Sequence, residues 1–259
     1  MAETGAQELA RGWPTVLAAA TGVGLGVAGL LTYNSGLFAH DLAIQAGVSR
    51  TMFGAAFFGS TLTMAIAMPW VGWLVDRYGP RRVATLGAIA LSSGFLALAH
   101  FVHSPVTFLV IMALVGFFAA LSSPVPYTRA VSGAFDRGRG LALGLTQVGI
   151  GIAAAVVPPT ITLVIVSYGW RHGYHALAAI ALLGVVPALA GRPGKDLGQR
   201  DRNSGSAFPA VRRSTLFKVQ LAAFVTMALA FAGMLAHFVP MLRDAGLPMQ
   251  KAGVIAGAI

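Results

Sequence analysis

Apolar residues fill long blocks of the chain, and polar residues gather in the short gaps between the blocks. A helix needs about 20 consecutive, mostly apolar residues to cross a lipid bilayer. Because lipid offers no hydrogen-bond partners, such segments must be helical, so we predict an all-α membrane protein. An eighth span is predicted to begin near residue 250, after seven others at 14–33, 52–75, 83–101, 105–127, 141–168, 173–190 and 216–242.

The composition supports membrane insertion. Hydrophobic residues make up 56% of the 259 positions, charged residues only 10%, and the mean hydropathy is +0.75. A soluble domain of this length would carry more charge. The first apolar run is too long for a signal peptide and further spans follow it. The absence of cysteine excludes disulfides, a thiol nucleophile and a thiolate metal site.

Lysine and arginine are distributed unevenly between alternate loops. The N-terminal tail and the loops after spans two, four and six carry one, three, three and seven of them, where the last of the seven, Lys218, lies at the very start of the next predicted span. These are fourteen in all, and the other loops carry four. The positive-inside rule therefore predicts a cytoplasmic N-terminus. The net charge of +10 is then a topology signal, with membrane lipid and not nucleic acid as the partner. Abundant arginine and alanine favour a bacterial inner membrane. All four tryptophans fall at predicted span ends, as in an aromatic belt.

A short repeat suggests how the spans are organised. "AGVSRTMFGA" at 46–55 aligns with "AGLPMQKAGV" at 245–254, and the polar stretch 192–214 separates six spans from the next. Six spans, a basic linker and a restart are typical of parallel-repeat transporters. We predict an N-terminal six-helix bundle (1–191), a cytoplasmic linker (192–214) and an incomplete C-terminal bundle (215–259). We therefore expect the chain to be truncated.

The loop "GWLVDRYGPRRV" at 72–83 places four charges within seven residues. With Gly72, Asp76, Arg77, Gly79 and Arg81, it resembles the loop 2–3 signature of the major facilitator superfamily. Glycine allows close helix approach at position 72 and a tight turn at position 79, and a carboxylate pairs readily with arginines. The resemblance implies that Asp76 latches the two halves of a transporter in one conformation, with Arg77 and Arg81 as helpers. The alternative is that these are ordinary loop charges that fix topology.

Other stretches resemble the monocarboxylate porter and oxalate/formate antiporter branch: "FDRGRGLALGLTQVGIG" (135–151), "YGWRHGY" (168–174) and "HFVPMLRDAGLP" (237–248). This resemblance implies a secondary active transporter of small organic anions that works by alternating access. The porters carry a lysine near the outer end of span one, and Asn34 takes that place here. Asparagine can hydrogen-bond a carboxylate but cannot neutralise it, so proton coupling is left open.

Few polar side chains fall inside the predicted spans. Tyr33, Asn34, Tyr127, Gln147 and His237 are the candidates for a substrate cavity. A buried amide needs partners, so Gln147 is expected to face substrate or a neighbouring helix. Arg129 lies at the cytoplasmic end of span four. It is either an interfacial topology charge or an inner-gate partner for the latch.

Two pairs of small residues suggest close helix packing. Gly22 and Gly26 in span one, and Gly140 and Gly144 in span five, each lie four residues apart and predict a small-residue face on their helix.

All six histidines fall at or near the predicted outer face. They suggest a pH sensor or metal site, or merely that histidine escapes the selection that keeps Lys and Arg inside. Without an acidic or third ligand we expect no metal and no cofactor.

The spans lack a base that lies close to a nucleophile, so we expect that the protein is not an enzyme. Alone, the fragment is expected not to transport. The alternative is a transport-inactive module or degenerate gene product that acts as scaffold or sensor. Substrate identity and oligomeric state are left open.

Overall fold

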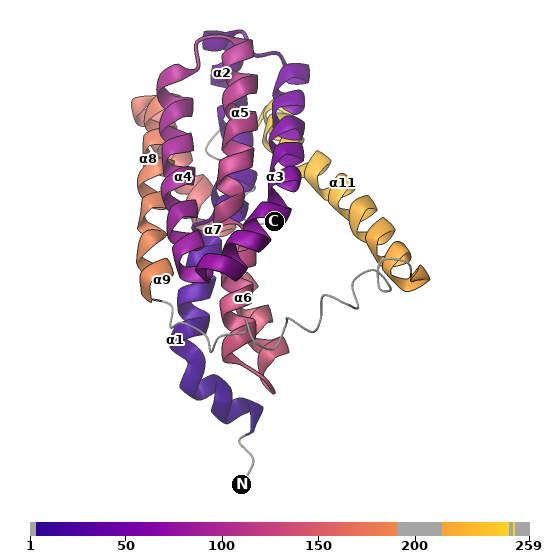
Figure 1. The fold of residues 1–259 in the computed structure, drawn as a ribbon. Helices are drawn as coiled ribbons and strands as arrows, with labels where there is room; N and C mark the ends of the chain where they lie inside the picture. The colour runs from indigo at the N-terminus through magenta and orange to yellow at the C-terminus, as the bar shows by residue number, and fades with distance from the viewer. Residues whose placement is uncertain (1–3, 191–213, 249–250, 252–259) are drawn as a thin grey trace.

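The computed structural model describes residues 4–190, 214–248 and 251, and helices form nearly all of this part of the chain (Figure 1). These described residues contain no β-strand, and six of their helical spans are long and apolar enough to cross a membrane. The all-α membrane fold predicted from the hydropathy pattern is therefore confirmed. In chain order the elements are α1 (Gly5–Gly24), the π-helical η1 (Ala28–Thr32), the 3₁₀-helical η2 (Ser35–Phe38), α2 (Ala39–Ala46), α3 (Arg50–Tyr78), α4 (Pro80–Phe101), α5 (Pro105–Ala119), the 3₁₀-helical η3 (Ala120–Ser122), α6 (Pro124–Ala134), α7 (Arg139–Tyr168), α8 (Trp170–Leu183), α9 (Val185–Ala190) and α11 (Thr215–Asp244).

Short connections between consecutive spans give the bundle two ends. We call the end where α1, α4 and α7 begin the basic end, because the arginine-rich loop 2–3 lies there. The other end, where α3, α5 and α8 begin, is called the opposite end. In Figure 1 the N-terminus lies beyond the basic end and α2 lies at the opposite end.

The first span differs most from its prediction. It was predicted at 14–33, but the helical run extends over Gly5–Ala46, 42 residues, with a break near Leu25 followed by η1 and η2. The side chains of Asn34 and Ser35 are buried in this run, because they donate to the carbonyls of Leu30 and Leu31 in the preceding turn. Asn34 therefore lies within the helical run and not at its end.

Local signals explain where the other helices begin and end. Ser49 caps α3 through the Met52 amide, and Ser104 forms a capping box with Thr107 at the start of α5. Gly79 ends α3 with a φ of 83°, a backbone conformation that favours glycine, and Pro80 begins α4. The tight turn predicted at Gly79 is therefore present.

The fourth span is also longer than predicted. It was predicted at 105–127 and extends over Pro105–Ala134, with a short 3₁₀ segment and an extended residue, Ser123, before α6. Pro124 lacks a backbone N–H and disfavours helical backbone at Ser123, which explains the interruption. Arg129 therefore lies on a helix, in the last part of this span.

Aromatic rings hold the spans together near the opposite end. Phe38 of η2 stacks on Tyr174 of α8 with ring centroids 3.8 Å apart, and Phe95 of α4 stacks on the same tyrosine. Phe53 of α3 stacks on Phe108 of α5. These rings belong to one buried apolar cluster that joins all six spans. Many outward-facing apolar side chains remain exposed, as a lipid environment requires.

Three of the four tryptophans are exposed, as an aromatic belt requires, and the fourth is buried. Trp13, Trp70 and Trp73 are more than half exposed. Trp170 is 2% exposed, because its Nε1–H donates to Gln45 Oε1 at 2.8 Å and its ring packs on Tyr174. It therefore joins α8 to α2 inside the protein.

The seventh predicted span corresponds to α11. This helix (orange to yellow in Figure 1) approaches the bundle near the opposite end, where it contacts η2, and it diverges from the bundle along its remaining length. Leu242, near its end, packs against the buried cluster. The predicted linker 192–214 and most of the predicted eighth span lie outside the described residues.

The short repeat is reflected in the backbone. Gly47 follows α2 with a φ of 66°, and Gly246, its counterpart in the alignment, follows α11 with a φ of 85°. Both positions adopt a conformation that favours glycine, which explains why glycine stands at each. The two segments therefore share a turn as well as a sequence pattern.

Candidate functional site

At the basic end an ion pair joins the second and fourth spans. Arg129 Nη2 on α6 donates to Asp76 Oδ1 on α3 at 2.9 Å. The Asp76 side chain is 62% exposed and the Arg129 side chain 37%, so the pair contributes only about 0–1 kcal/mol. An interaction of this strength can form and break without a large cost.

The other residues of the loop 2–3 motif do not contact Asp76 in this structure. The Arg77 guanidinium lies 5.2 Å from the Trp73 ring centroid and 5.6 Å from that of Tyr78. Arg81 is exposed at the start of α4. Among the described residues, Arg129 is thus the arginine that meets the candidate latch carboxylate, not Arg77 or Arg81.

The close helix approach expected at Gly72 is wrong for the described residues. No described heavy atom lies within 4 Å of a Cβ built at this position. The reason is that Gly72 lies on a face of α3 that the other five spans do not cover.

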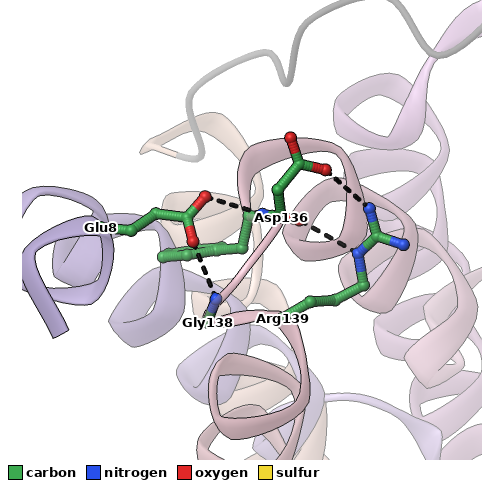
Figure 2. A network of polar contacts seen from close by, with 5 residues as sticks. Glu8, Asp136, Gly138 and Arg139 are labelled. Carbon is green, nitrogen blue, oxygen red and sulfur yellow. Dashed lines mark hydrogen bonds and ion pairs between the residues drawn. The ribbon is translucent and has the colours of Figure 1, made fainter. Parts of the chain in front are cut away.

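A second polar network at the basic end fixes the start of α1 (Figure 2). Glu8 accepts hydrogen bonds from the backbone amides of Asp136 at 2.7 Å and Gly138 at 2.8 Å. Arg139 extends this network, because it donates to the Phe135 carbonyl and to Asp136 Oδ1. Sequence reasoning missed Glu8, although it is one of only eight acidic residues. The network joins the first span to the loop between spans four and five.

Asn34 has an unusual hydrogen-bond pattern. Its Nδ2 donates to the carbonyls of Leu30 at 2.8 Å and Gly29 at 3.4 Å, while its Oδ1 is buried without a hydrogen-bond partner among the described residues. Since carbonyls only accept, the amide group must face them and the oxygen must face away. In this arrangement Asn34 therefore offers an acceptor, while its amide group is engaged with the two backbone carbonyls.

The other predicted cavity residues are not gathered into one site. Tyr33 is half-buried beside Asn34, and Tyr127 is buried with its ring against Gly22 of α1. Gln147 is exposed on α7 and makes no hydrogen bond within the described residues, so the expected contact with a neighbouring helix is not present there. His237 lies on α11, and its side chain is outside the described part of the chain.

The small residues of the first span pack as predicted, and those of the fifth span do not. Cβ atoms built at Gly22 and Gly26 would collide with Tyr127 and with the Ser122 carbonyl. Gly140 and Gly144 have open space around them, and Gly149 instead makes the close contact with α1. The uncovered glycines of α7 therefore lie on a free face.

At the opposite end an ion pair joins the bundle to α11. Arg50, the first residue of α3, donates through Nη1 and Nη2 to the two carboxylate oxygens of Asp244, each at 2.7 Å. Two parallel bonds orient the arginine more strictly than one would. Sequence reasoning did not find this pair, because its members lie 194 positions apart.

Within the described residues no group of three or more His, Cys, Asp or Glu side chains is arranged to hold a metal ion. The two ion pairs, one at each end, together with the buried acceptor of Asn34, are thus the features that bear on function.

The comparisons with known proteins agree with this architecture. The chain is 30% identical over 156 residues to the riboflavin transporter RibJ of Trypanosoma cruzi (strain CL Brener), covering 59% of this chain and 33% of that protein. It is 32% identical over 174 residues to human (Homo sapiens) monocarboxylate transporter 11, covering 66% of this chain and 36% of that protein. The chain thus spans about a third of the length of these relatives.

A solved structure shares the fold. The crystal structure of a D-xylose-proton symporter superposes with a TM-score of 0.70 at 14% identity, covering 95% of this chain and 65% of that one. The sequence model described as Major Facilitator Superfamily matches residues 16–259. A match over nearly the whole chain, with the six-span bundle seen here, shows that this protein belongs to the major facilitator superfamily, whose members are transporters and not enzymes.

Proposed function

We propose that this protein forms part of a secondary active transporter that moves small organic anions across a cell membrane by alternating access. The observation that carries the proposal is the position of the two ion pairs. Arg50–Asp244 joins α3 to α11 at the opposite end, and Asp76–Arg129 lies at the basic end. Exposed pairs of this kind are individually weak, so each can form and break as a transporter rocks.

In this arrangement the opposite end is the closed one. Contact between α11 and the bundle is made there, through Arg50–Asp244, η2 and Leu242, whereas α11 diverges from the bundle away from that end (Figure 1). We infer that the basic end is open, and that it faces the cytoplasm of a bacterial cell according to the distribution of Lys and Arg. Asp76 would act as a latch when the molecule adopts the other conformation.

The uncovered faces of α3 and α7 support a second half to the transporter. Cβ atoms built at Gly59, Gly72, Gly140, Gly144 and Gly151 would meet nothing within 4 Å. Small residues on a membrane helix allow another helix to approach closely. We propose that further helices of a C-terminal bundle or of a companion polypeptide pack on these faces, and that transport requires them.

The substrate proposal rests on Asn34. Its free Oδ1 is an acceptor, so the group that meets it must be a donor such as a hydroxyl, an N–H or a protonated carboxyl. An organic acid that carries a hydroxyl group satisfies this condition, and it belongs to the small organic anions proposed above as substrates. A neutral substrate rich in N–H and hydroxyl donors is the second candidate, favoured by the same acceptor and by the similarity to a riboflavin transporter.

Uptake of labelled compounds into host cells tests the proposal. The gene is deleted and then restored either as wild type or as the double variant R50C/D244C, which is free of other cysteines. We expect restored uptake of at least one of lactate, pyruvate, formate, oxalate or riboflavin. A bifunctional maleimide should abolish uptake in the double variant, because it cross-links the two cysteines across the space that the arginine side chain occupied and keeps the opposite end closed. The single variant R50C is the control and should keep its uptake after the same treatment.

Three results would contradict the proposal. Unchanged uptake by the cross-linked double variant would show that uptake does not require the opposite end to open. Absence of uptake for every compound, together with a stable partner protein, would favour a scaffold or sensor. Uptake by proteoliposomes that contain only the 259-residue chain would contradict the need for further helices.

A further inference from the structure

Three histidine rings lie together at the opposite end of the bundle. His100 is near the end of α4, and His172 and His175 are on the first turns of α8. The Nε2 atoms of His100 and His175 are 3.0 Å apart, with ring centroids 4.8 Å apart. The ring of His172 lies 5.7 Å from that of His175. The close pair crosses between two helices, so neither His-x-x-His motif in the sequence reveals it.

The short distance between the two Nε2 atoms requires something positive between them. Two nitrogen lone pairs repel each other at 3.0 Å, so either one ring donates a proton to the other or both bind a shared cation. Both rings reach the protein surface, His100 as an exposed side chain and His175 as a half-buried one. A cation can therefore enter from solvent.

The spacing suits coordination by a metal ion. Metal–nitrogen bonds of about 2.0–2.1 Å that meet at a right angle place the two nitrogens about 2.8–3.0 Å apart, whereas a tetrahedral angle requires about 3.3–3.4 Å. The observed 3.0 Å matches the first arrangement. We propose that His100 and His175 bind a divalent transition metal through their Nε2 atoms, with water at the remaining positions.

His172 has the tautomer that a neighbouring ligand needs. Its Nδ1 lies 2.7 Å from the Tyr168 carbonyl, which can only accept, so Nδ1 carries the proton and Nε2 has a free lone pair. A backbone carbonyl commonly orients metal-binding histidines in this way. The described residues contain no preformed cluster of three ligands, so His172 stands beside the two-histidine site and does not complete it.

The surroundings determine which metal binds and how tightly. Imidazole ligands suit Zn²⁺, Ni²⁺ and Cu²⁺, and the right-angled spacing favours Cu²⁺, which also binds most tightly in the series. Arg171 opposes the bound charge, because its Nη1 donates to the Ala99 carbonyl, one residue before His100. With two protein ligands and this nearby cation, we expect micromolar and not nanomolar affinity. The bound metal would join α4 to α8.

Copper titration of the full chain in detergent tests the site. Metal is first removed with a chelator, and Cu²⁺ is then added to wild type, H100A, H175A and H103A. His103 is the matched control, because it is exposed at the same end and its ring contacts no other described histidine. We expect one Cu²⁺ per chain with micromolar affinity in wild type and H103A, and at least tenfold weaker binding in H100A and H175A. Electron paramagnetic resonance should show two equatorial nitrogen ligands.

A thermal melt separates loss of the site from loss of the fold. Without copper, the four proteins should unfold at similar temperatures, because both ligands reach the surface. Copper should raise the unfolding temperature only where both ligands are present. Equal copper affinity in wild type and H100A, or a spectrum with fewer than two nitrogen ligands, would overturn the proposal.

Discussion

Asn34 shows how a single polar residue is accommodated inside a membrane span. It is fully buried in the irregular part of the first span, where a π-helical and a 3₁₀-helical segment follow one another. The Nδ2 of Asn34 donates to the carbonyls of Leu30 and Gly29 in the π-helical segment. The amide therefore stabilises the irregular backbone on one side and presents an unpaired acceptor on the other.

Replacing Asn34 by alanine should destabilise the protein. The substitution removes the donor that the Leu30 and Gly29 carbonyls use, and leaving such groups unpaired costs about 1–3 kcal/mol. Gln147→Ala is the matched control, because that amide is exposed and makes no hydrogen bond within the described residues, so its free energy of unfolding should change by no more than about 0.5 kcal/mol. Unfolding in mixed detergent and denaturing micelles measures both. Equal effects of the two substitutions would contradict this role for Asn34.

At the scale of elements, the first and fifth spans cross at a backbone contact. A Cβ at Gly149 of α7 would lie 1.8 Å from the Ala20 carbonyl of α1, and a Cβ at Gly24 of α1 would lie 2.4 Å from the Gly149 carbonyl. Only glycine allows the two backbones to approach so closely. The crossing fixes where the first span lies in the bundle.

Alanine substitutions on one helix distinguish this crossing from the free face. Gly149→Ala forces α1 and α7 apart, so we expect a loss of stability of about 1–3 kcal/mol, the usual cost of overpacking. In the isolated chain, a Cβ at Gly144 meets no described atom within 4 Å, so Gly144→Ala should gain up to about 1 kcal/mol there, because alanine favours helix. The same unfolding measurement on both variants checks the difference. A stable Gly149→Ala variant would show that the crossing is looser than described.

Element positions could be predicted well from the sequence, and contacts between elements could not. Hydropathy located the spans because they are long apolar blocks, and Gly79 marked a helix end. Hydropathy does not reveal that Trp170 points inward or that the Asn34 amide donates to carbonyls of its own helix, because both depend on the contacts that each side chain makes in the fold. The Arg50–Asp244 and His100–His175 contacts join residues far apart in the chain, and no local pattern encodes them. The latch at Asp76 remains a prediction.

At the scale of the whole molecule, charge and polar contacts divide the bundle into two unlike ends. The basic end carries the arginines of loop 2–3, the Asp76–Arg129 pair and the Glu8 network. The opposite end carries the Arg50–Asp244 pair and the histidine cluster. Alternating access requires that these ends lie on different sides of a membrane. The distribution of Lys and Arg predicts that the basic end faces the cytoplasm.

Labelling of single cysteines in intact cells tests this arrangement most directly. The chain contains no cysteine, so Arg81→Cys at the basic end and His103→Cys at the opposite end can each be followed without background. Both positions are exposed. With a membrane-impermeant maleimide, we expect His103→Cys to react in intact cells and Arg81→Cys to react only after the membrane is made permeable. Reaction of Arg81→Cys in intact cells, or of both variants alike, would contradict the account.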